Sequence, residues 1–407
     1  MNLFTKWILK ASGLANPDRW LVDAMGGGKV ASGARVNEHT ALQSTAVMAC
    51  VRIISETVAS LPLLMYQKQA EGGKSRAPNH PLYSVLHDIG NDEMTAYTLR
   101  EVMQGHLCTW GNAYCDIERD ENGRIVALWP LRPDKTIPQR NPITKKIEYL
   151  TIINGEQLIL PFDKVMHIPG FGFDGLIGYS PIAMAREAIG LAMATEEYGA
   201  RYFGNGAKPG GVLTHPKALK KESKDNMRDS WNEMHGGLDK QHRVAVLEEG
   251  VTYTQIGLAP EDSQFLETRQ FQLNEIARIF RVPPHMIGDL SKATFSNIEQ
   301  QSIDFVTHSI RPWLVRWEQT IKMRLLSPNE RKRGLFAEHL VDAILRGDIK
   351  SRYEAYAVGR QNGWLSADDI RALENMNPLP DGQGEVYLVN GNMLPADQAG
   401  KGGDTGQ

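Results

Sequence analysis

The segment from Gly170 to Gly175 has the spacing of a nucleotide-binding turn. It reads Gly-Phe-Gly-Phe-Asp-Gly after a predicted strand, and a GxGxxG turn aims the first amides of a helix at a pyrophosphate. That helix must begin directly after the glycines, but five residues precede Pro181. An acid for the ribose is expected about twenty residues further on, yet Glu196 and Glu197 fall inside a predicted helix. We interpret the segment as a flexible glycine-rich loop.

Other catalytic and metal-binding patterns are missing from the sequence. The glycines before Lys29 lack the first glycine and the Ser or Thr of a P-loop. The eleven histidines contain no HExxH motif and no metal-like spacing. Glu248 and Glu249 flank a predicted hairpin turn at Gly250 and are expected to be solvated. We expect no catalytic residue, no metal and no cofactor.

Two runs of basic residues could bind a partner. The first lies at the start of a predicted helix and comprises Lys217, Lys220, Lys221, Lys224 and Arg228. The second is Arg331-Lys332-Arg333. In a monomer each would be a solvated face, but in a ring the symmetry repeats each charge around the axis and forms a band.

Composition limits the class of protein. The chain has 407 residues, 42% hydrophobic and 23% charged, which indicates two or three packed modules. The net charge of −3 argues against a basic coat for nucleic acid. Three cysteines without a CxxC pair favour a reduced, intracellular protein. We expect neither a signal peptide nor a transmembrane helix, because no apolar run is long enough.

The elements that must position these residues follow from periodicity. A four-three-four-three spacing predicts a helix that ends at Pro62, and its apolar face is Val47, Val51, Ile54, Val58 and Leu61. From about 112 to 168 the pattern alternates and predicts two hairpins, with turns at 120–123 and 154–155. Ser180-Pro181 predicts a helix that continues to Phe203 and is rich in small residues around Gly190, which favour close packing.

The second half of the chain is predicted to be mainly helical. An insert at 209–259 combines strands at 211–214, 242–247 and 251–257 with a helix at about 217–234. A long helix follows to Arg281, and Ser296 with Glu299 predicts a capping box for another, which Pro312 should kink. Helices are expected again within 336–376. The glycine-rich remainder is expected to be disordered apart from a short strand at Val386–Val389.

Seven blocks of sequence carry a family resemblance through their order and spacing. The most specific are Ile279–Gly288 and Phe295–Gln301. The others are 49–57, 80–83, 111–114, 128–131 and 197–206. With these blocks the chain resembles the portal proteins of long-tailed double-stranded DNA bacteriophages, from about residue 40 to 395. None of the blocks is a catalytic motif, and we expect no enzyme.

The resemblance implies an α+β subunit of a closed ring, usually of twelve copies, at one capsid vertex of the virion after assembly in the host cytoplasm. The implied parts are an N-terminal arm (1–40), a β-rich wing (41–180), a first stem helix (181–208), a small α/β clip (209–259), a second stem helix (260–284), a tunnel loop (285–297), a kinked helix returning to the wing (298–335), a helical crown (336–380) and a flexible tail (381–407).

The resemblance also implies partners. The terminase large subunit docks during packaging, the head–tail adaptor protein replaces it, and major capsid and scaffold proteins surround the ring. Double-stranded DNA passes without sequence-specific binding, and no membrane is involved. The expected clip contacts are the basic residues 217–228 named above. The expected channel residues in the tunnel loop are His285, Gly288, Asp289, Ser291, Lys292, Thr294, Ser296 and Asn297.

Two other classes of function remain open from the sequence. One is a nucleotide-binding enzyme that uses the Gly170–Gly175 loop. The other is a different ring-forming connector or adaptor, although such proteins tend to be shorter and to lack the order of stem, clip and stem.

Overall fold

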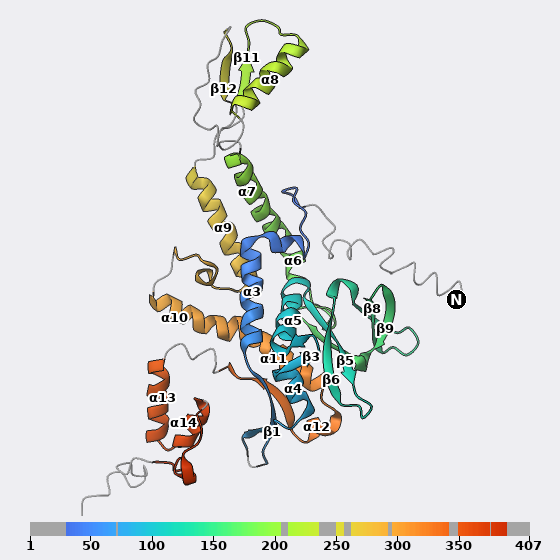
Figure 1. Ribbon diagram of the computed structural model, residues 1–407, viewed down its shortest axis with the longest axis vertical. Coiled ribbons are helices and arrows are strands. Elements are labelled where there is room, and N and C mark those ends of the chain that lie inside the picture. Colours follow the sequence, from blue (N-terminus) through green and yellow to red (C-terminus); the bar gives the residue numbers. More distant parts are fainter. Residues whose placement is uncertain are drawn as a thin grey trace, which may run out of the picture. The chain divides into compact units, whose positions relative to one another are not determined.

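The fold was analysed in a computed structural model of the chain. It describes residues 30–70, 72–204, 211–235, 250–255, 262–291, 295–341, 349–374 and 376–388. The chain divides into two compact units, Met1–Leu340 and Val341–Gln407, each described below by itself. Helices and small antiparallel sheets alternate along it (Figure 1), so the α+β class is confirmed.

Two helices, α3 (Thr45–Ser60) and α5 (Ala96–Trp110), form the centre of the first unit. All five apolar residues predicted for one helical face, from Val47 to Leu61, are buried. Arg100 of α5 is also buried, and its guanidinium donates hydrogen bonds to the carbonyls of Leu86 and Ala59, near the ends of α4 (Pro81–His87) and α3. One buried cation therefore satisfies carbonyls that the two helices leave unpaired.

A three-stranded sheet covers one end of this helix pair. Its strands are β1 (Leu63–Lys68), β2 (Lys74–Arg76) and β13 (Leu335–His339), with β1 in the middle. Leu63 pairs with His339 and Gln67 with Leu335. The predicted crown boundary at 336 is therefore wrong: 335–340 belongs to the first unit, because alternate β13 residues are buried and the strand hydrogen-bonds to β1.

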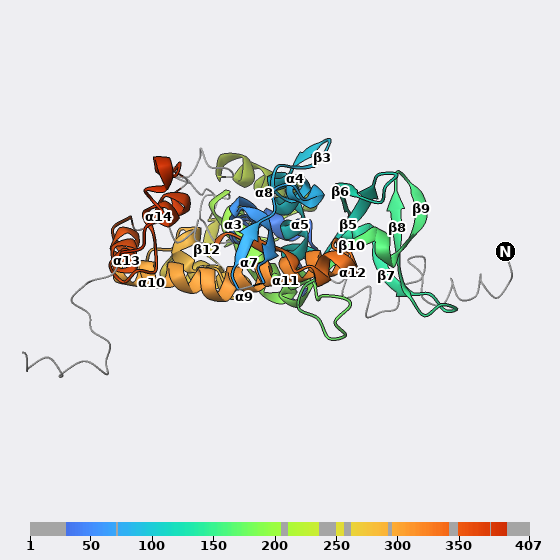
Figure 2. The same cartoon turned by 90° about the horizontal axis from the view of Figure 1, so that it is seen from below.

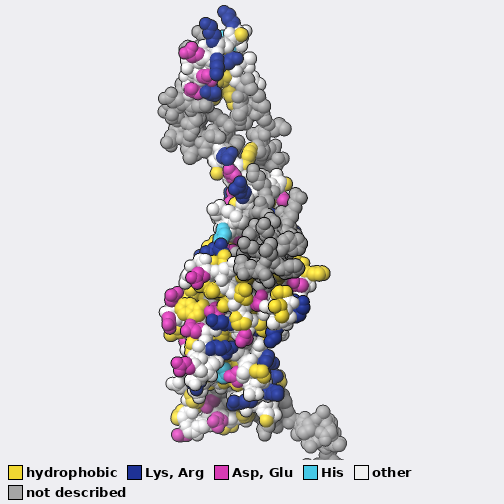
Figure 3. All heavy atoms as spheres, turned by 90° about the vertical axis from the view of Figure 1, so that its right-hand side faces the viewer, with side chains coloured by type: hydrophobic (Ala, Val, Ile, Leu, Met, Phe, Trp, Pro, Cys, Tyr) yellow, Lys and Arg dark blue, Asp and Glu magenta, His cyan; other side chains and the backbone are white. Residues whose placement is uncertain are grey.

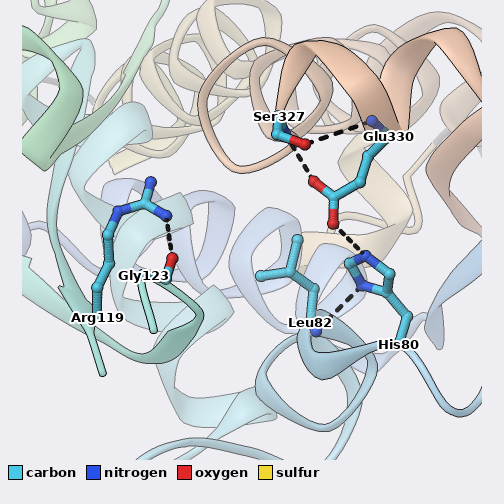
Figure 4. Close-up of polar contacts among 6 residues, drawn as sticks. All are labelled: His80, Leu82, Arg119, Gly123, Ser327 and Glu330. Atoms are coloured by element: carbon cyan, nitrogen blue, oxygen red, sulfur yellow. Dashed lines mark hydrogen bonds and ion pairs between the residues drawn. The ribbon is translucent and has the colours of Figure 1, made fainter. Parts of the chain in front are cut away.

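A polar junction joins the segments next to that sheet. His80 caps α4 (Pro81–His87) by accepting from the Leu82 amide, and its Nε2 lies 2.9 Å from Glu330 of α12 (Pro328–Lys332). Glu330 also completes a capping box with Ser327 (Figure 4). A single carboxylate therefore connects the starts of two helices that lie far apart in sequence.

Two further three-stranded sheets contain the predicted hairpins. One has the order β10-β5-β6 (Val165–Pro169, Asn112–Arg119, Ile125–Leu131), and the other is β7-β8-β9 (Ile137–Arg140, Ile147–Ile153, Glu156–Pro161). They lie side by side in Figure 2, and Tyr114, Leu131, Tyr149, Leu160 and Val165 form a shared core. Both hairpins are confirmed. A two-stranded β3–β4 pair (Ile89–Asn91, Met94–Thr95) completes this part.

A buried chain of hydrogen bonds crosses this core. Arg324 donates to the Tyr149 hydroxyl at 2.6 Å, and that hydroxyl lies 3.4 Å from His167 Nδ1. His167 Nε2 lies 3.1 Å from Asn112 Oδ1. Burial, and then the charge of Arg324, lower the pKa of His167 to about 3. The imidazole is therefore neutral near pH 7, with its proton on Nε2 and Nδ1 accepting from tyrosine.

The segments predicted to be the stem contain α6 (Pro181–Met184), α7 (Arg186–Gly204) and α9 (Asp262–Phe280). The Ser180 cap is confirmed by its bond from the Ala183 amide at 3.0 Å. The predicted continuous helix is interrupted at Ala185, which leaves the helical region at φ −98° and ψ 12°. A Cβ on Gly199 would lie 2.5 Å from the Phe265 ring, so α7 and α9 approach closely there.

Gly190 packs against the N-terminal segment around Val30, and not against another helix. A Cβ at this position would lie 2.4 Å from Cγ2 of Val30, which is buried. The Ala31 amide donates to Glu187 at 3.1 Å, and Val36 is buried as well. Residues 30–40 thus pack on the body and not in a free arm, because glycine gives the chain room to approach α7. The predicted arm at 1–29 lies outside the described residues.

The segment predicted to be the clip contains β11 (Gly211–Thr214), α8 (Lys221–His235) and β12 (Thr252–Gln255). The two strands pair antiparallel, and the Trp231 ring of α8 stacks on Tyr253 of β12 with centroids 5.1 Å apart. The predicted strand–helix–strand order is confirmed, while the further strand predicted at 242–247 and Glu248-Glu249 lie outside the described residues.

The third long helix is divided into α10 (Phe295–Asp304), a π-helical turn (Phe305–Ile310) and α11 (Arg311–Arg324). Pro312 lacks an amide proton and its ring crowds the carbonyl four residues earlier, which falls in the π turn. Pro312 was predicted to kink this helix, and the structure has a π-helical turn directly before α11. The predicted capping box is not, because α10 begins at Phe295 and Ser296 lies inside the helix and not before it.

The second unit contains α13 (Ile349–Gln361) and α14 (Ala367–Leu373). Ser366 caps α14 in a capping box with Asp369. The start of the predicted flexible tail packs here, because the Asp368 amide donates to Gly384 O at 2.9 Å. The strand predicted at Val386–Val389 is absent from its described part, 386–388. The tail from 389 onwards lies outside the described residues.

Acid should weaken the first unit through His167. In the unfolded chain its pKa is about 6.5, so between that value and about 3 only the unfolded state binds the proton. The stability is therefore full above pH 6.5 and falls on acidification, by about 2 kcal/mol at pH 5. We expect His167→Gln to have a lower midpoint temperature of thermal unfolding than the unsubstituted protein at pH 7.5. Between pH 7.5 and 5, however, its midpoint temperature should fall by less than that of the unsubstituted protein.

The exposed His308 provides the matched control. His308→Gln should show the same decrease with acid as the unsubstituted protein. An undiminished decrease in His167→Gln would show that other groups cause the acid sensitivity.

Candidate functional site

The glycine-rich loop 170–179 is closed by its own backbone contacts. The Gly170 amide donates to Gly111 O at 2.8 Å, and the Tyr179 amide donates to Phe171 O at 2.7 Å. Asp174 accepts from the amides of Leu176 and Ile177 at 2.8 and 2.9 Å. Several of the amides that a phosphate would require are therefore already bonded within the protein.

Three glycines of this loop, Gly170, Gly172 and Gly178, serve close packing, whereas Gly175 has nothing within 4 Å. A Cβ on Gly178 would lie 2.1 Å from Gly111 O, and one on Gly111 would lie 2.0 Å from Tyr179 O. Arg316 of α11 donates to the carbonyls of Pro169 and Gly170, both at 3.1 Å. The loop is thus a braced joint between the wing and α6, which corrects the expectation of flexibility and gives no support to the nucleotide-binding alternative.

The described part of the tunnel loop is held on both sides. His285 Nδ1 lies 2.9 Å from Gln301 of α10, and the carboxylate of Asp289 accepts from the side chain of Gln270 in α9. Asp289 also accepts from the Ser291 amide at 3.0 Å. Gly288 has φ +91°, a left-handed conformation that glycine adopts readily.

The remaining predicted channel residues are only partly placed. Lys292 and Thr294 lie outside the described residues, and Ser296 and Asn297 lie in the first turn of α10. Just before the loop, Arg281 at the end of α9 has φ +56°, and its carbonyl accepts from the Ser309 hydroxyl at 2.6 Å. The end of α9 is thereby attached to the π turn, so both helices that flank the loop are connected at its base.

The basic residues of the clip gather around the start of α8. Lys217, Lys220, Lys221 and Lys224 are exposed, as is Arg228, which pairs with Asp225 and Asp229 at 3.3 and 3.2 Å. Figure 3 shows basic and acidic side chains together on this part of the molecule. Cations near a helix N-terminus oppose its macrodipole. Stability of α8 therefore does not explain the lysines.

Metal-binding clusters, membrane-spanning helices and reactive thiols are the other kinds of site that the described residues could contain. No cluster of three or more His, Cys, Asp or Glu side chains that could hold a metal occurs among the described residues. Within those residues no helix is both long and apolar enough to cross a bilayer. Cys50, Cys108 and Cys115 are buried free thiols, and burial raises the pKa of Cys50 and Cys108 to about 12.

Asn112 was missed as a structural residue by the sequence analysis. It belongs to a block that supported the family resemblance, but no role followed from its type. Its Oδ1 accepts from the Gly178 amide and its Nδ2 donates to the Gly178 carbonyl, both at 2.8 Å. Asn112 therefore connects the glycine-rich loop to the buried series of hydrogen bonds that ends at Arg324. Its position directly after a left-handed glycine was the available signal.

The described residues form a mixed α+β fold of helices and small antiparallel sheets. The chain matches the family of phage portal proteins over residues 45–375. It is 39% identical to the "Probable portal protein" of Streptomyces phage phiC31 over 379 residues, which are 90% of this chain and 82% of that protein. It is 35% identical to the portal protein of Enterobacteria phage HK97 over 369 residues, 90% and 86% of the two chains.

Solved structures share the fold. An HK97-family phage portal protein from Corynebacterium diphtheriae has a TM-score of 0.58 at 18% identity, over 79% of this chain and 99% of that one. A chain in the virion of a native gene transfer agent particle has a TM-score of 0.59 at 22% identity, over 89% and 99%. The chain belongs to the phage portal protein family, whose members are structural, non-enzymatic virion proteins.

The joint at Gly111 should be intolerant of a side chain. Gly111→Ala would place Cβ on the Tyr179 carbonyl at φ +72°, whereas Gly123→Ala has a similar φ of +77° and nothing within 4 Å. We expect Gly123→Ala to lower the free energy of unfolding in urea by about 1 kcal/mol and Gly111→Ala by more than about 3 kcal/mol. Equal losses would show that the close approach does not limit stability.

Proposed function

We propose that copies of this chain close into a ring, usually of twelve, that forms the DNA conduit at one vertex of the capsid. Membership of the phage portal family is the observation that carries this proposal. A similar fold occurs in the neck of a native gene transfer agent particle computed with C12 symmetry, with a TM-score of 0.56. Closure requires head-to-tail contacts, in which different surfaces of neighbouring copies meet.

The clip would dock the terminase large subunit during packaging and the head–tail adaptor protein afterwards. The clip is inserted between α7 and α9, two antiparallel helices in contact, and its exposed lysines lie where they do not stabilise α8. An acidic docking surface on each partner would pair with these lysines. Major capsid and scaffold proteins would contact the same ring elsewhere.

The tunnel loop would line the narrow part of the channel. The bonds from His285 to α10 and from Asp289 to α9 support a loop that is tied to both flanking helices. Lys292 of each copy would then present one positive charge to passing phosphates. Few such charges slow slippage without trapping DNA, because each neutralised phosphate adds affinity that depends on salt.

Ring formation tests the proposal directly. The purified protein should form closed rings without a cofactor, seen in axial views by electron microscopy and as one large species in sedimentation. The physical reason is that a head-to-tail interface keeps adding copies until the rotation closes. Monomers or dimers alone, over a range of salt and protein concentrations, would count against the proposal.

Charge reversal in the clip should separate docking from assembly. Lys220→Glu, Lys221→Glu and Lys224→Glu combined should leave rings intact and strongly reduce DNA packaging or tail joining, because the acidic partner surfaces would be repelled. The control is Arg124→Glu, Lys145→Glu and Lys146→Glu, three exposed wing residues with the same change in charge. Normal packaging and tail joining by the clip variant would disprove the docking role.

Cross-linking locates the channel constriction. A cysteine at Lys292 carrying a DNA-reactive cross-linker should attach to packaged DNA, because this position would lie nearest the phosphates. The same reagent at Lys217 of the clip gives the comparison. Cross-links at Lys217 but never at Lys292 would place the constriction elsewhere.

A further inference from the structure

The second unit lacks an apolar core of its own among its described residues. The buried hydrophobic residues of the described chain end at Ala337. Among the residues of the second unit whose burial the structure describes, the buried ones are Gly359, Ser366 and Gly384. The exposed large hydrophobic residues of this unit include Trp364, exposed by 71%, and also Tyr353, Val358, Leu373, Met376, Val386, Tyr387 and Leu388. Such a concentration of exposed apolar side chains marks an interaction surface.

Polar contacts hold the unit together instead. Arg352 of α13 pairs with Glu374 at 2.7 Å, and Tyr356 donates to the same carboxylate at 2.9 Å. The Leu379 amide donates to Asp368 at 2.8 Å. Each such bond contributes only about 1 kcal/mol net, while ordering a residue costs a similar amount. Burial of the apolar side chains against a partner would supply the missing stabilisation.

The exposed apolar residues of the second unit are distributed so that one neighbouring copy could contact the unit on each of two sides. Successive residues of a helix are about 100° apart, so Tyr353 and Val358 of α13 lie on different flanks of the face that carries Arg352. Trp364 and the segment Val386–Leu388 add exposed apolar side chains outside α13, and the Val386 carbonyl accepts a hydrogen bond from Arg360 of α13 at 3.3 Å. A unit in a head-to-tail assembly needs two different surfaces, one for each neighbour.

The charges of the two surfaces are complementary. Outside the ion pair between Arg352 and Glu374 of the same copy, α13 carries Lys350 and Arg360 against Glu354, a net charge of +1. Residues 362–388 carry Arg371 against four other acids, a net charge of −3; these acids are Asp368, Asp369, Asp381 and Glu385. Opposite charges favour α13 of one copy against residues 362–388 of another, and like charges disfavour α13 against α13.

We propose that the second unit completes its core with a second copy of this chain, through α13 of one copy against Trp364 and Val386–Leu388 of the next. The inference rests on the ring proposed above and names surfaces that meet within it. Trp364 is the expected centre of the contact, because large aromatic side chains dominate the energetics of interfaces.

Photo-cross-linking in the full-length protein tests this interface. A diazirine amino acid replaces Trp364 in one preparation and Leu365 in another. The second is the matched control, since a Cβ on Gly359 would lie 2.8 Å from Leu365 Cδ1, so Leu365 faces the unit's own α13. Irradiation should shift the Trp364 variant from monomer to covalent dimers on a denaturing gel, with the link mapped to α13. The Leu365 variant should stay monomeric, with links inside its own chain.

The outcomes separate this inference from the proposed function. Rings in the electron microscope with no copy-to-copy link from position 364, or with links from 364 only to its own chain, overturn the inference and leave the ring proposal intact. Copy-to-copy links from position 365 that match those from 364 also overturn it, because the inward packing of Leu365 is a premise. Absence of rings refutes the proposed function itself.

Discussion

The antiparallel pairing of β1 with β13 is the constraint on which the first unit depends. β1 follows the first long helix, while β13 follows the stem, clip and tunnel loop, so the sheet closes only after the chain has returned. The chain between β1 and β13 is therefore held at both of its ends by this sheet. Arg324, at the end of α11, donates to Tyr149 and Phe162 O just before that return. The returning chain, α11 with β13, is therefore fixed to the earlier part of the first unit by both a sheet and a buried cation.

Sequence patterns predicted those parts of the fold that local burial decides. The helical face from Val47 to Leu61, the wing hairpins and the Ser180 cap were all predicted, because each follows from neighbouring residues. Contacts between distant segments were not. The β13 pairing, the packing of Val30 on Gly190 and the attachment of 384 to α14 depend on tertiary geometry that no local period encodes.

In the candidate site too, features set by neighbouring residues were predicted, and contacts between distant segments were not. The position of the clip lysines around a helix start could be predicted from turn and helix signals, because these signals are local. The joint at Gly170–Gly178 was misjudged as flexible, since glycine has two opposite uses: freedom in an open chain, and close approach of backbones in a packed one. Only the contact with Gly111, far away in sequence, decides between them. Once that contact is present, the enzyme-like spacing has a purely structural explanation.

The nesting of the clip has a consequence for how such chains diversify. The described clip strands pair with each other, and Trp231 of the clip helix stacks on one of them. The rest of the first unit consists of α7, α9 and the residues before and after these two helices. A recombination event that exchanges residues between these two helices would leave the wing core unaltered, provided that the new segment joins the same two helix ends. Lineages could therefore inherit the body vertically and acquire the clip horizontally, as a cassette.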